Sequence, residues 1–242
     1  MKSNDANDAR ERIIDASIEL FSKRGFHATT TSEIAEAAGV TKGLIYYYFK
    51  SKEEILSHVV NSLLEDATSI TMDFVQEGII QMIKDGELDI EYERMKFSNE
   101  ESAIVFVNRL LEYYERILDY LLENRLLLRV LMFESLKDSK HHNDLFRLLD
   151  LSRDVDSNPI LKLISEADHD FTYSLDMELF KFFFSVMPLV TFAAYYDDLK
   201  ERSMMSGDEL RNSFLQSFRE VLSSLKSGNE ISLKTKRSND TG

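Results

Sequence analysis

Residues 29–52 read TTTSEIAEAAGVTKGLIYYYFKSK, and this segment carries the strongest local signals in the chain. Thr30 and Glu33 have the spacing of a capping box, in which the hydroxyl accepts from a free helix amide and the carboxylate reaches back to the cap. The short helix that they open is expected to end at Gly39, because glycine readily adopts the positive φ of a helix C-terminus. Thr41 is then placed to cap a second helix. The segment therefore predicts two short helices joined by a tight turn.

Two helices joined in this way form a helix-turn-helix, the motif that presents one helix to the major groove of DNA. A steep crossing requires a small residue at the contact, as Ala35 provides, and the other expected contact residues are Ile34, Ala38, Val40 and Ile45. The outward side chains of the second helix are then Thr41, Lys42, Leu44, Tyr46, Tyr47 and Tyr48. Consecutive residues lie about 100° apart around a helix, so three adjacent tyrosines cannot all enter a small core. The alternative to a DNA-binding surface is that the tyrosines lie in the core and the lysines are only solvated. This alternative explains each residue taken singly, but it does not explain the caps, the turn glycine and the charge pattern together.

The charge distribution agrees with a local DNA-binding surface. The chain has 43 acidic and 29 basic residues and a net charge of −14, which argues against wholesale binding of nucleic acid or anionic lipid. Residues 23–52, however, include five basic and only two acidic side chains. Exposed tyrosines near Lys42, Lys50 and Lys52, together with free amides at helix N-termini, suit contacts with phosphates and thymine methyls. We therefore expect a compact basic patch on an acidic protein.

Residues 10–56 resemble the DNA-binding domain of the TetR family of bacterial transcriptional regulators. The matching residues are Ile14, Ala16, Leu20, Phe21, Gly25, Thr29, Thr30, Ile34, Ala35, Ala38, Gly39, Val40, Lys42, Gly43, Tyr46, Tyr47, Tyr48, Phe49, Lys50, Lys52 and Glu53. The resemblance implies an all-helical homodimer whose N-terminal helix-turn-helix binds a palindromic operator. It also implies that a larger helical domain binds a small effector and dimerises through its last two helices.

Carried over by position, the resemblance implies individual DNA contacts. The residues that look like phosphate contacts are Thr30, Lys42, Tyr47 and Lys52, and those at base-contact positions are Thr31, Ser32, Gly43, Leu44 and Tyr46. Thr41 and Lys50 complete the predicted DNA-binding set. Leu44 stands where many relatives have Thr or Ser, so an apolar contact replaces a hydrogen bond there.

The rest of the chain predicts an all-α protein, because Pro and Gly number only 2 and 8 and almost every long segment has a period of 3.6 residues. We expect a three-helix helix-turn-helix domain at 1–54, a larger helical ligand-binding and dimerisation domain at 55–227, and a disordered polar tail at 228–242. Further helices are expected at about 68–84, 100–123, 125–137, 142–153, 159–167, 175–199 and 208–227. The acidic segment 85–99 alternates like a strand, but its composition favours a solvated loop.

The predicted effector pocket lies among the helices at 100–137, where the resemblance places it. Its expected lining is Phe106, Leu110, Tyr113, Tyr114, Ile117 and Phe133, with Phe184 from a later helix. Such a lining suits a largely apolar or aromatic effector. A cationic aromatic compound is a second alternative, because Glu112, Glu115 and Glu134 lie nearby in the sequence and rings can stack on tyrosine. Periodic aromatic residues also occur in ordinary cores.

The predicted dimer interface combines apolar stripes from the last two long helices. Its residues are Phe180, Phe183, Met187, Leu210, Phe214, Phe218 and Val221. A four-helix interface of this kind would hold two recognition helices about 34–36 Å apart, one turn of DNA. The alternative is that both stripes belong to the core of a single chain. Pro188 should kink its helix, because it removes one backbone hydrogen bond.

Several other classes of protein are excluded or disfavoured. The chain has no Cys, which removes disulfide scaffolds, thiolate metal sites and Cys nucleophiles. Two His-carboxylate clusters, at 141–144 and 166–170, lack zinc-site spacing and are expected to be solvated. No nucleophile elbow, Walker loop or Rossmann fingerprint occurs, so neither an enzyme nor a cofactor is expected. No secretion signal is visible and the apolar run 182–196 is shorter than the roughly 18 residues of a membrane span, so we expect a cytoplasmic protein.

The sequence thus predicts a ligand-responsive transcriptional regulator, a repressor that a small effector releases from DNA. The alternative is a helical DNA-binding protein without a small effector, which recruits a protein partner instead.

Overall fold

The computed structural model describes residues 2–91, 94–147, 158–224 and 226–232 of the chain. The N-terminal helices are α1 (Lys2–Arg24), α2 (Thr31–Ala38), α3 (Lys42–Tyr48) and α4 (Lys52–Phe74), and α4 continues through a π-helical segment η1 (Val75–Ile80) into α5 (Gln81–Lys84). Two long helices follow the strands β1 (Leu88–Glu91) and β2 (Arg94–Phe97), namely α6 (Glu100–Glu123) and α7 (Arg125–Ser135). The described part of the chain is mainly helical, as predicted.

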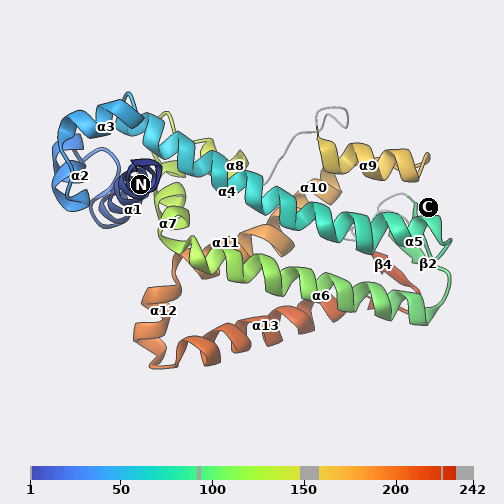
Figure 1. The fold of residues 1–242 in the computed structure, drawn as a ribbon. Helices are drawn as coiled ribbons and strands as arrows, with labels where there is room; N and C mark the ends of the chain where they lie inside the picture. The colour runs from blue at the N-terminus through green and yellow to red at the C-terminus, as the bar shows by residue number, and fades with distance from the viewer. Residues whose placement is uncertain (1, 92–93, 148–157, 225, 233–242) are drawn as a thin grey trace.

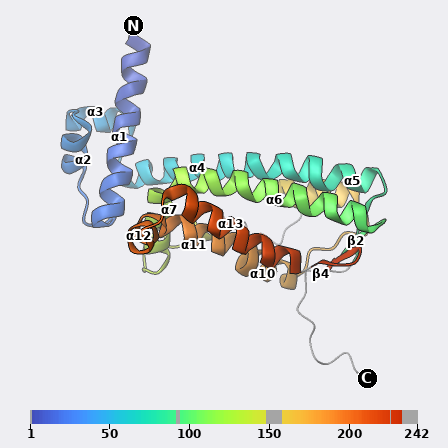
Figure 2. The same cartoon turned by 90° about the horizontal axis from the view of Figure 1, so that it is seen from below.

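The second half of the chain consists of shorter elements. They are α8 (Asp144–Arg147), α9 (Pro159–Ala167), α10 (Leu175–Lys181), the π-helical η2 (Phe182–Val186), α11 (Met187–Ala194), α12 (Tyr196–Ser203), α13 (Gly207–Ser224), β3 (Lys226–Ser227) and β4 (Glu230–Ser232). Figure 1 shows α2 and α3 at one end of the molecule and the strands at the other, with α4 and α6 running between them. Figure 2 shows α1 projecting from the body at the end that carries α2 and α3.

Two helix predictions needed correction. The helix expected to begin near residue 68 is not separate, because α4, η1 and α5 follow one another without a break from Lys52 to Lys84. The helix expected at 175–199 runs without a gap from Leu175 to Ala194 through α10, η2 and α11, and Tyr195 separates it from α12. Pro188 stands in the first turn of α11, directly after η2, where its missing N–H is tolerated. The backbone therefore changes from a π-helix to an α-helix next to this proline.

The acidic segment 85–99 is not a solvated loop. It forms a β-hairpin in which Leu88 pairs with Phe97 and Ile90 with Met95. These four side chains are all buried, so the alternation outweighs the acidic composition.

The predicted disordered tail also contains structure. Ile231 pairs with Met95 and is buried, and the four strands form an antiparallel sheet in the order β1-β2-β4-β3. The prediction was therefore wrong for residues 230–232, whose pairing partner lies far away in the sequence. Residues 233–242 lie outside the described part of the chain.

Two apolar clusters hold the fold together. The larger contains buried residues of α1–α4 together with residues of α6, α7, α11 and α13, so the two predicted domains share one core. The smaller joins η1, the sheet, the first half of α6 and α9. One segment, Met177–Ala194, has the length and mean hydropathy (1.5) of a membrane span and is 33% buried in the fold. Core helices of soluble proteins have the same composition, so this segment does not decide where the protein resides.

Candidate nucleic-acid interface and ligand cavity

The predicted caps of the helix-turn-helix are present. The Thr30 hydroxyl accepts from the amide of Glu33, and the Glu33 carboxylate accepts from the amide of Thr30 at 2.8 Å. Gly39 ends α2 with φ of 64°, and the Thr41 side chain accepts from the amide of Leu44 at the start of α3. These local contacts fix where each short helix begins and ends, as the sequence predicted.

Helix α3 presents a polar and aromatic surface to solvent. Ile45 is fully buried against α2, whereas Tyr46 and Tyr47 are 51% and 78% exposed. The Tyr46 hydroxyl lies 3.4 Å from the Thr31 hydroxyl, so the two helices contribute to one surface. Lys42 extends over the Tyr46 ring, with its Nζ 6.0 Å from the ring centroid. Five further residues of the predicted DNA-binding set are exposed, namely Thr30, Ser32, Thr41, Gly43 and Lys50. Leu44 is half-buried.

Lys52 differs from the other predicted DNA-binding residues. Its Nζ donates to the carbonyl oxygens of Phe26, His27 and Thr29 at 2.8, 3.2 and 2.9 Å, and it lies 4.6 Å from the centroid of the Phe26 ring. An ammonium group has three N–H donors, so all of them are engaged. This geometry does not support the predicted phosphate contact and instead ties α4 to the loop before α2.

His58 lies beside the helix-turn-helix on α4. Its Nε2 is 2.7 Å from a guanidinium nitrogen of Arg10, and its ring is 5.9 Å from that of Phe49. Burial, followed by the charge of Arg10, lowers the pKa of His58. The neutral imidazole therefore accepts the hydrogen bond, and His58 helps to hold α1 against α4.

A second set of contacts joins the N-terminal helices to α7 and α8. The carboxylate of Glu134 is buried, accepts from Lys137 at 2.9 Å and lies 3.5 Å from Nε2 of His27. The His141 ring packs edge-on against the buried Phe26 ring at 4.8 Å. These contacts lie on the loop between α1 and α2, so the position of that loop depends on α7 and on the segment between α7 and α8 as well as on α4.

Further contacts extend from this loop toward the interior. Nδ1 of His141 lies 2.7 Å from the Asp144 carboxylate, and the same carboxylate lies 3.4 Å from Arg147. Arg147 also donates to Asn61 on α4 at 2.8 Å. Within the described residues, no group of three or more His, Asp or Glu side chains converges as a metal site would require.

A cavity of about 410 Å³ lies between α4, α6 and the elements from α8 to α11. Five of the predicted pocket residues line it: Phe106, Leu110, Tyr113, Tyr114 and Ile117. Phe133 and Phe184 do not line it, and they are 62% and 49% exposed. We call this space the apolar cavity, because most of its lining is aliphatic or aromatic.

Two tyrosine hydroxyls in the apolar cavity are already hydrogen-bonded. The Tyr113 hydroxyl lies 3.2 Å from that of Thr71, and Tyr114 is paired with the Ser185 hydroxyl. Burial raises the pKa of both phenols, so both stay protonated. The pocket prediction did not include α4. The face of α4 that lines the cavity is apolar apart from Thr68 and Thr71.

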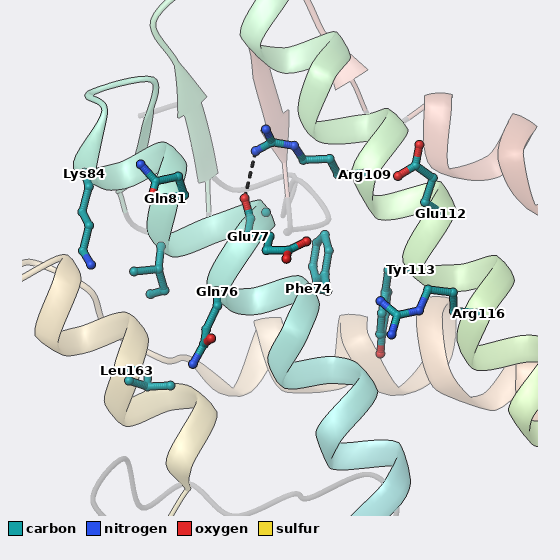
Figure 3. Close-up of a pocket in the computed structure, with 12 residues that line it drawn as sticks. Phe74, Gln76, Glu77, Gln81, Lys84, Arg109, Glu112, Tyr113, Arg116 and Leu163 are labelled. Carbon is teal, nitrogen blue, oxygen red and sulfur yellow. Dashed lines mark hydrogen bonds between the residues drawn. The ribbon is translucent and has the colours of Figure 1, made fainter.

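A second depression, the polar groove (Figure 3), shares Phe74 and Tyr113 with the apolar cavity. It has a volume of about 740 Å³ and is lined mainly by polar side chains from η1, α5 and α6. Arg109 donates to the carbonyl of Glu77 at 2.9 Å across it. The Phe74 and Tyr113 rings stack at 4.8 Å and form the wall between groove and cavity. The described lining of the groove carries both charge signs, and its shape is open.

The predicted dimer residues have different surroundings. Leu210 and Phe218 are buried within the chain, and Phe214 stacks on Phe192 at 4.1 Å. Phe180 lines the apolar cavity. Phe183 and Val221 are exposed, and Met187 is half-buried. The alternative of intrachain packing therefore describes Leu210, Phe214 and Phe218 better than an interface does.

The geometry is that of a helix-turn-helix protein with a helical body that contains an apolar cavity. Residues 13–59 match the family described as bacterial regulatory proteins, tetR family. The HTH-type transcriptional regulator YerO of Bacillus subtilis (strain 168) is 56% identical over 50 residues, which is 21% of this chain and 17% of that protein. AcrR of Shigella flexneri is 44% identical over 55 residues, or 23% and 26% of the two chains. The N-terminal part of the chain is therefore similar to the DNA-binding domains of TetR-family regulators.

The likeness to these relatives is confined to their DNA-binding domains, since the matches span only 17% and 26% of their lengths. A solved structure from Clostridium perfringens, whose name connects it with regulation of fatty acid metabolism, covers 86% of this chain and 97% of its own. The TM-score is 0.52 and the sequence identity 20%, so this likeness shows the fold alone. The fold of the body is thus shared with a regulator of similar size.

Proposed function

We propose that the protein is a transcriptional repressor that binds a palindromic operator as a homodimer and is released by a small, largely apolar effector in the apolar cavity. The observation that carries this proposal is the path of α4. Its first turn packs Ile55 and Leu56 in the core that holds α2 and α3, and its second half lines the cavity from Leu64 onward. One continuous helix therefore shares a core with the DNA-reading helices at one end and lines the cavity at the other.

The proposed DNA contacts follow from the exposed face of α2 and α3. Lys42, Lys50, Thr30 and Tyr47 would contact phosphates, which fix the position of the protein on DNA. Base contacts would come from Thr31, Ser32, Gly43, Leu44 and Tyr46, with Leu44 against an apolar base surface such as a thymine methyl. Lys52 is left out of this set, because its donors are engaged within the chain.

In the proposed dimer, the exposed parts of η2 and α13 meet their symmetry mates, with Phe183 and Val221 at the contact. Both side chains are exposed in the single chain, where burying them against a partner would remove apolar surface from water. A two-fold arrangement would set two α3 helices one turn of DNA apart, about 34–36 Å.

In the proposed response, effector binding tilts α4 and changes the distance between the two α3 helices. An effector that favours the wider arrangement must weaken DNA binding by the same factor by which DNA weakens effector binding. The protein would then act in the cytoplasm as a regulator and not as an enzyme.

The proposal is tested by selecting fragments of the source genome with the purified protein at about 150 mM salt, near the physiological ionic strength. Enrichment of a short palindrome beside a few promoters is expected. Retention of no DNA, or of all fragments equally, would contradict it. A specific palindrome that no small molecule releases, together with a co-purifying protein, would favour the partner-recruiting alternative.

A further inference from the structure

We infer that the effector is an amphipathic anion, a long apolar chain that ends in a carboxylate or another compact anionic group, and that Arg147 recognises its charge. This inference rests on the proposed function, because it names the class of effector for the same cavity.

The charge of the cavity lining is the first argument. Arg147 and Lys181 are the charged side chains among its described lining residues, which include no Asp or Glu. This is the reverse of the whole chain, where acidic residues outnumber basic ones by 43 to 29. Glu112, Glu115 and Glu134, whose positions in the sequence suggest a cationic effector, lie outside the lining. A ligand cation would find no carboxylate among these described lining residues, and burial of an unpaired charge is costly.

The cavity also differs between its two ends. At one end the Phe146 and Phe182 rings stack with 6.5 Å between their centroids. Phe146 precedes Arg147 in the sequence, and Phe182 follows Lys181. This ring contact joins α8 to the start of η2, and Arg147 of α8 also donates to Asn61 in the first half of α4. At the other end the sheet contributes only apolar side chains, namely Ile90, Met95 and Ile231.

The separation of the ends suits a long ligand. On α6 the lining runs from Phe106 to Leu121, which is about 22 Å at the helical rise of 1.5 Å per residue. An anionic group near α8 would therefore leave room for an extended apolar tail directed toward the sheet.

Arg147 is placed to exchange its present partners for a ligand. Its contact with Asp144 is long, 3.4 Å, whereas Asp144 has a shorter contact of 2.7 Å with His141. The Arg147 side chain is 47% exposed, so its guanidinium can turn without unpacking a core. A planar guanidinium can donate two parallel hydrogen bonds to a carboxylate, which makes arginine selective for such groups.

The test uses three probes with the same chain length: dodecanoate, dodecanol and dodecyltrimethylammonium. Their affinities for the full-length protein are measured by calorimetry below the concentration at which they form micelles, and release of the selected operator is measured in parallel. The variant is Arg147→Gln, with Arg147→Lys to retain the charge. Arg129→Gln is the matched control, because Arg129 is 44% exposed, pairs with Asp198 and does not line the cavity.

Dodecanoate is expected to bind at least about tenfold more tightly than dodecanol, as one charge-assisted pair provides. Arg147→Gln should remove most of that preference without changing dodecanol binding, Arg147→Lys should retain part of it, and Arg129→Gln should retain all of it. Equal binding of dodecanoate and dodecanol, or tighter binding of the ammonium compound, would overturn the inference. If neutral or cationic probes then release DNA, the proposed repressor stands and only the effector class is wrong. If no probe binds or releases DNA, the inference fails, and a search for other releasing compounds decides the proposed function separately.

Discussion

Replacing Lys52 by methionine should lower the stability of the protein and leave the salt dependence of DNA binding unchanged. The ammonium donates to three backbone carbonyls at 2.8–3.2 Å and covers the Phe26 ring. Methionine keeps most of the apolar stem but leaves those carbonyls without their donor. We expect the free energy of unfolding to fall by about 2–3 kcal/mol, close to the value of one hydrogen bond to a charged group. The three bonds share a single charge at a half-buried site, so their contributions do not add.

The matched variant is Lys42→Met, which changes an exposed lysine on α3 with no carbonyl partners of this kind among its described contacts. It should change stability by less than about 0.5 kcal/mol. In the logarithmic plot of the association constant against salt concentration, it should reduce the slope by about 0.9 for each phosphate that Lys42 neutralises.

Urea unfolding followed by circular dichroism gives the stabilities, and operator binding at several salt concentrations gives the slopes. The reasoning about Lys52 would be refuted by a variant of unchanged stability whose salt slope falls by about 0.9. That result would mean that the ammonium leaves the three carbonyls and binds phosphate in the DNA complex.

Three further predictions concern other parts of the molecule. Tyr46→Ala should change the preferred operator sequence in a binding selection, and an equal loss of affinity for operator and random DNA would contradict a base contact. Because the folded-state pKa of His58 is lowered, the stability that depends on its neutral form is present above the unfolded pKa of about 6.5 and is lost as pH falls through the folded pKa. Urea titrations at several pH values should show this loss in the native protein and a smaller one in His58→Gln; identical pH profiles would assign the loss to other groups. Ile231→Ala should lower the free energy of unfolding by about 2 kcal/mol and weaken dodecanoate binding, with Glu230→Gln as a neighbouring control, because Ile231 is buried in the sheet and lines the cavity. An unchanged stability would show that β4 adds nothing to the fold.

The sequence was most informative where the deciding contacts are local. The caps at Thr30 and Thr41 and the turn at Gly39 each depend on residues within a few positions, so their spacing alone predicts them. The exposure of Tyr46 and Tyr47 follows from helical geometry in the same way. The fold class and the helix-turn-helix could therefore be predicted before any tertiary contact was known.

The errors concern contacts between distant segments. The hairpin at 88–97 was missed because its exposed residues are strongly acidic, although the alternating positions Leu88 and Ile90 are buried. The strand around Ile231 depends on pairing with Met95, which no local pattern near the C-terminal end reveals. The partners of Lys52 could not be predicted for the same reason, because they are carbonyl oxygens whose positions only the folded loop determines.

Helices α4 and α8 connect the apolar cavity with the loop between α1 and α2, which leads into the DNA-reading helices. Helix α4 lines the cavity and holds this loop through Lys52. Helix α8 borders the cavity through Arg147, and the His141 ring, paired with Asp144 of α8, packs on Phe26 in the same loop. In the proposed mechanism a ligand that attracts Arg147 acts on both elements, because Arg147 also donates to Asn61 of α4. Such a ligand changes the position of α2 only by binding one arrangement of these elements better than the other. In this mechanism Arg147 recognises the charge of the ligand and also contacts α4, the helix that transmits the response. The same contacts therefore determine both which ligand charge the cavity selects and how strongly DNA binding responds.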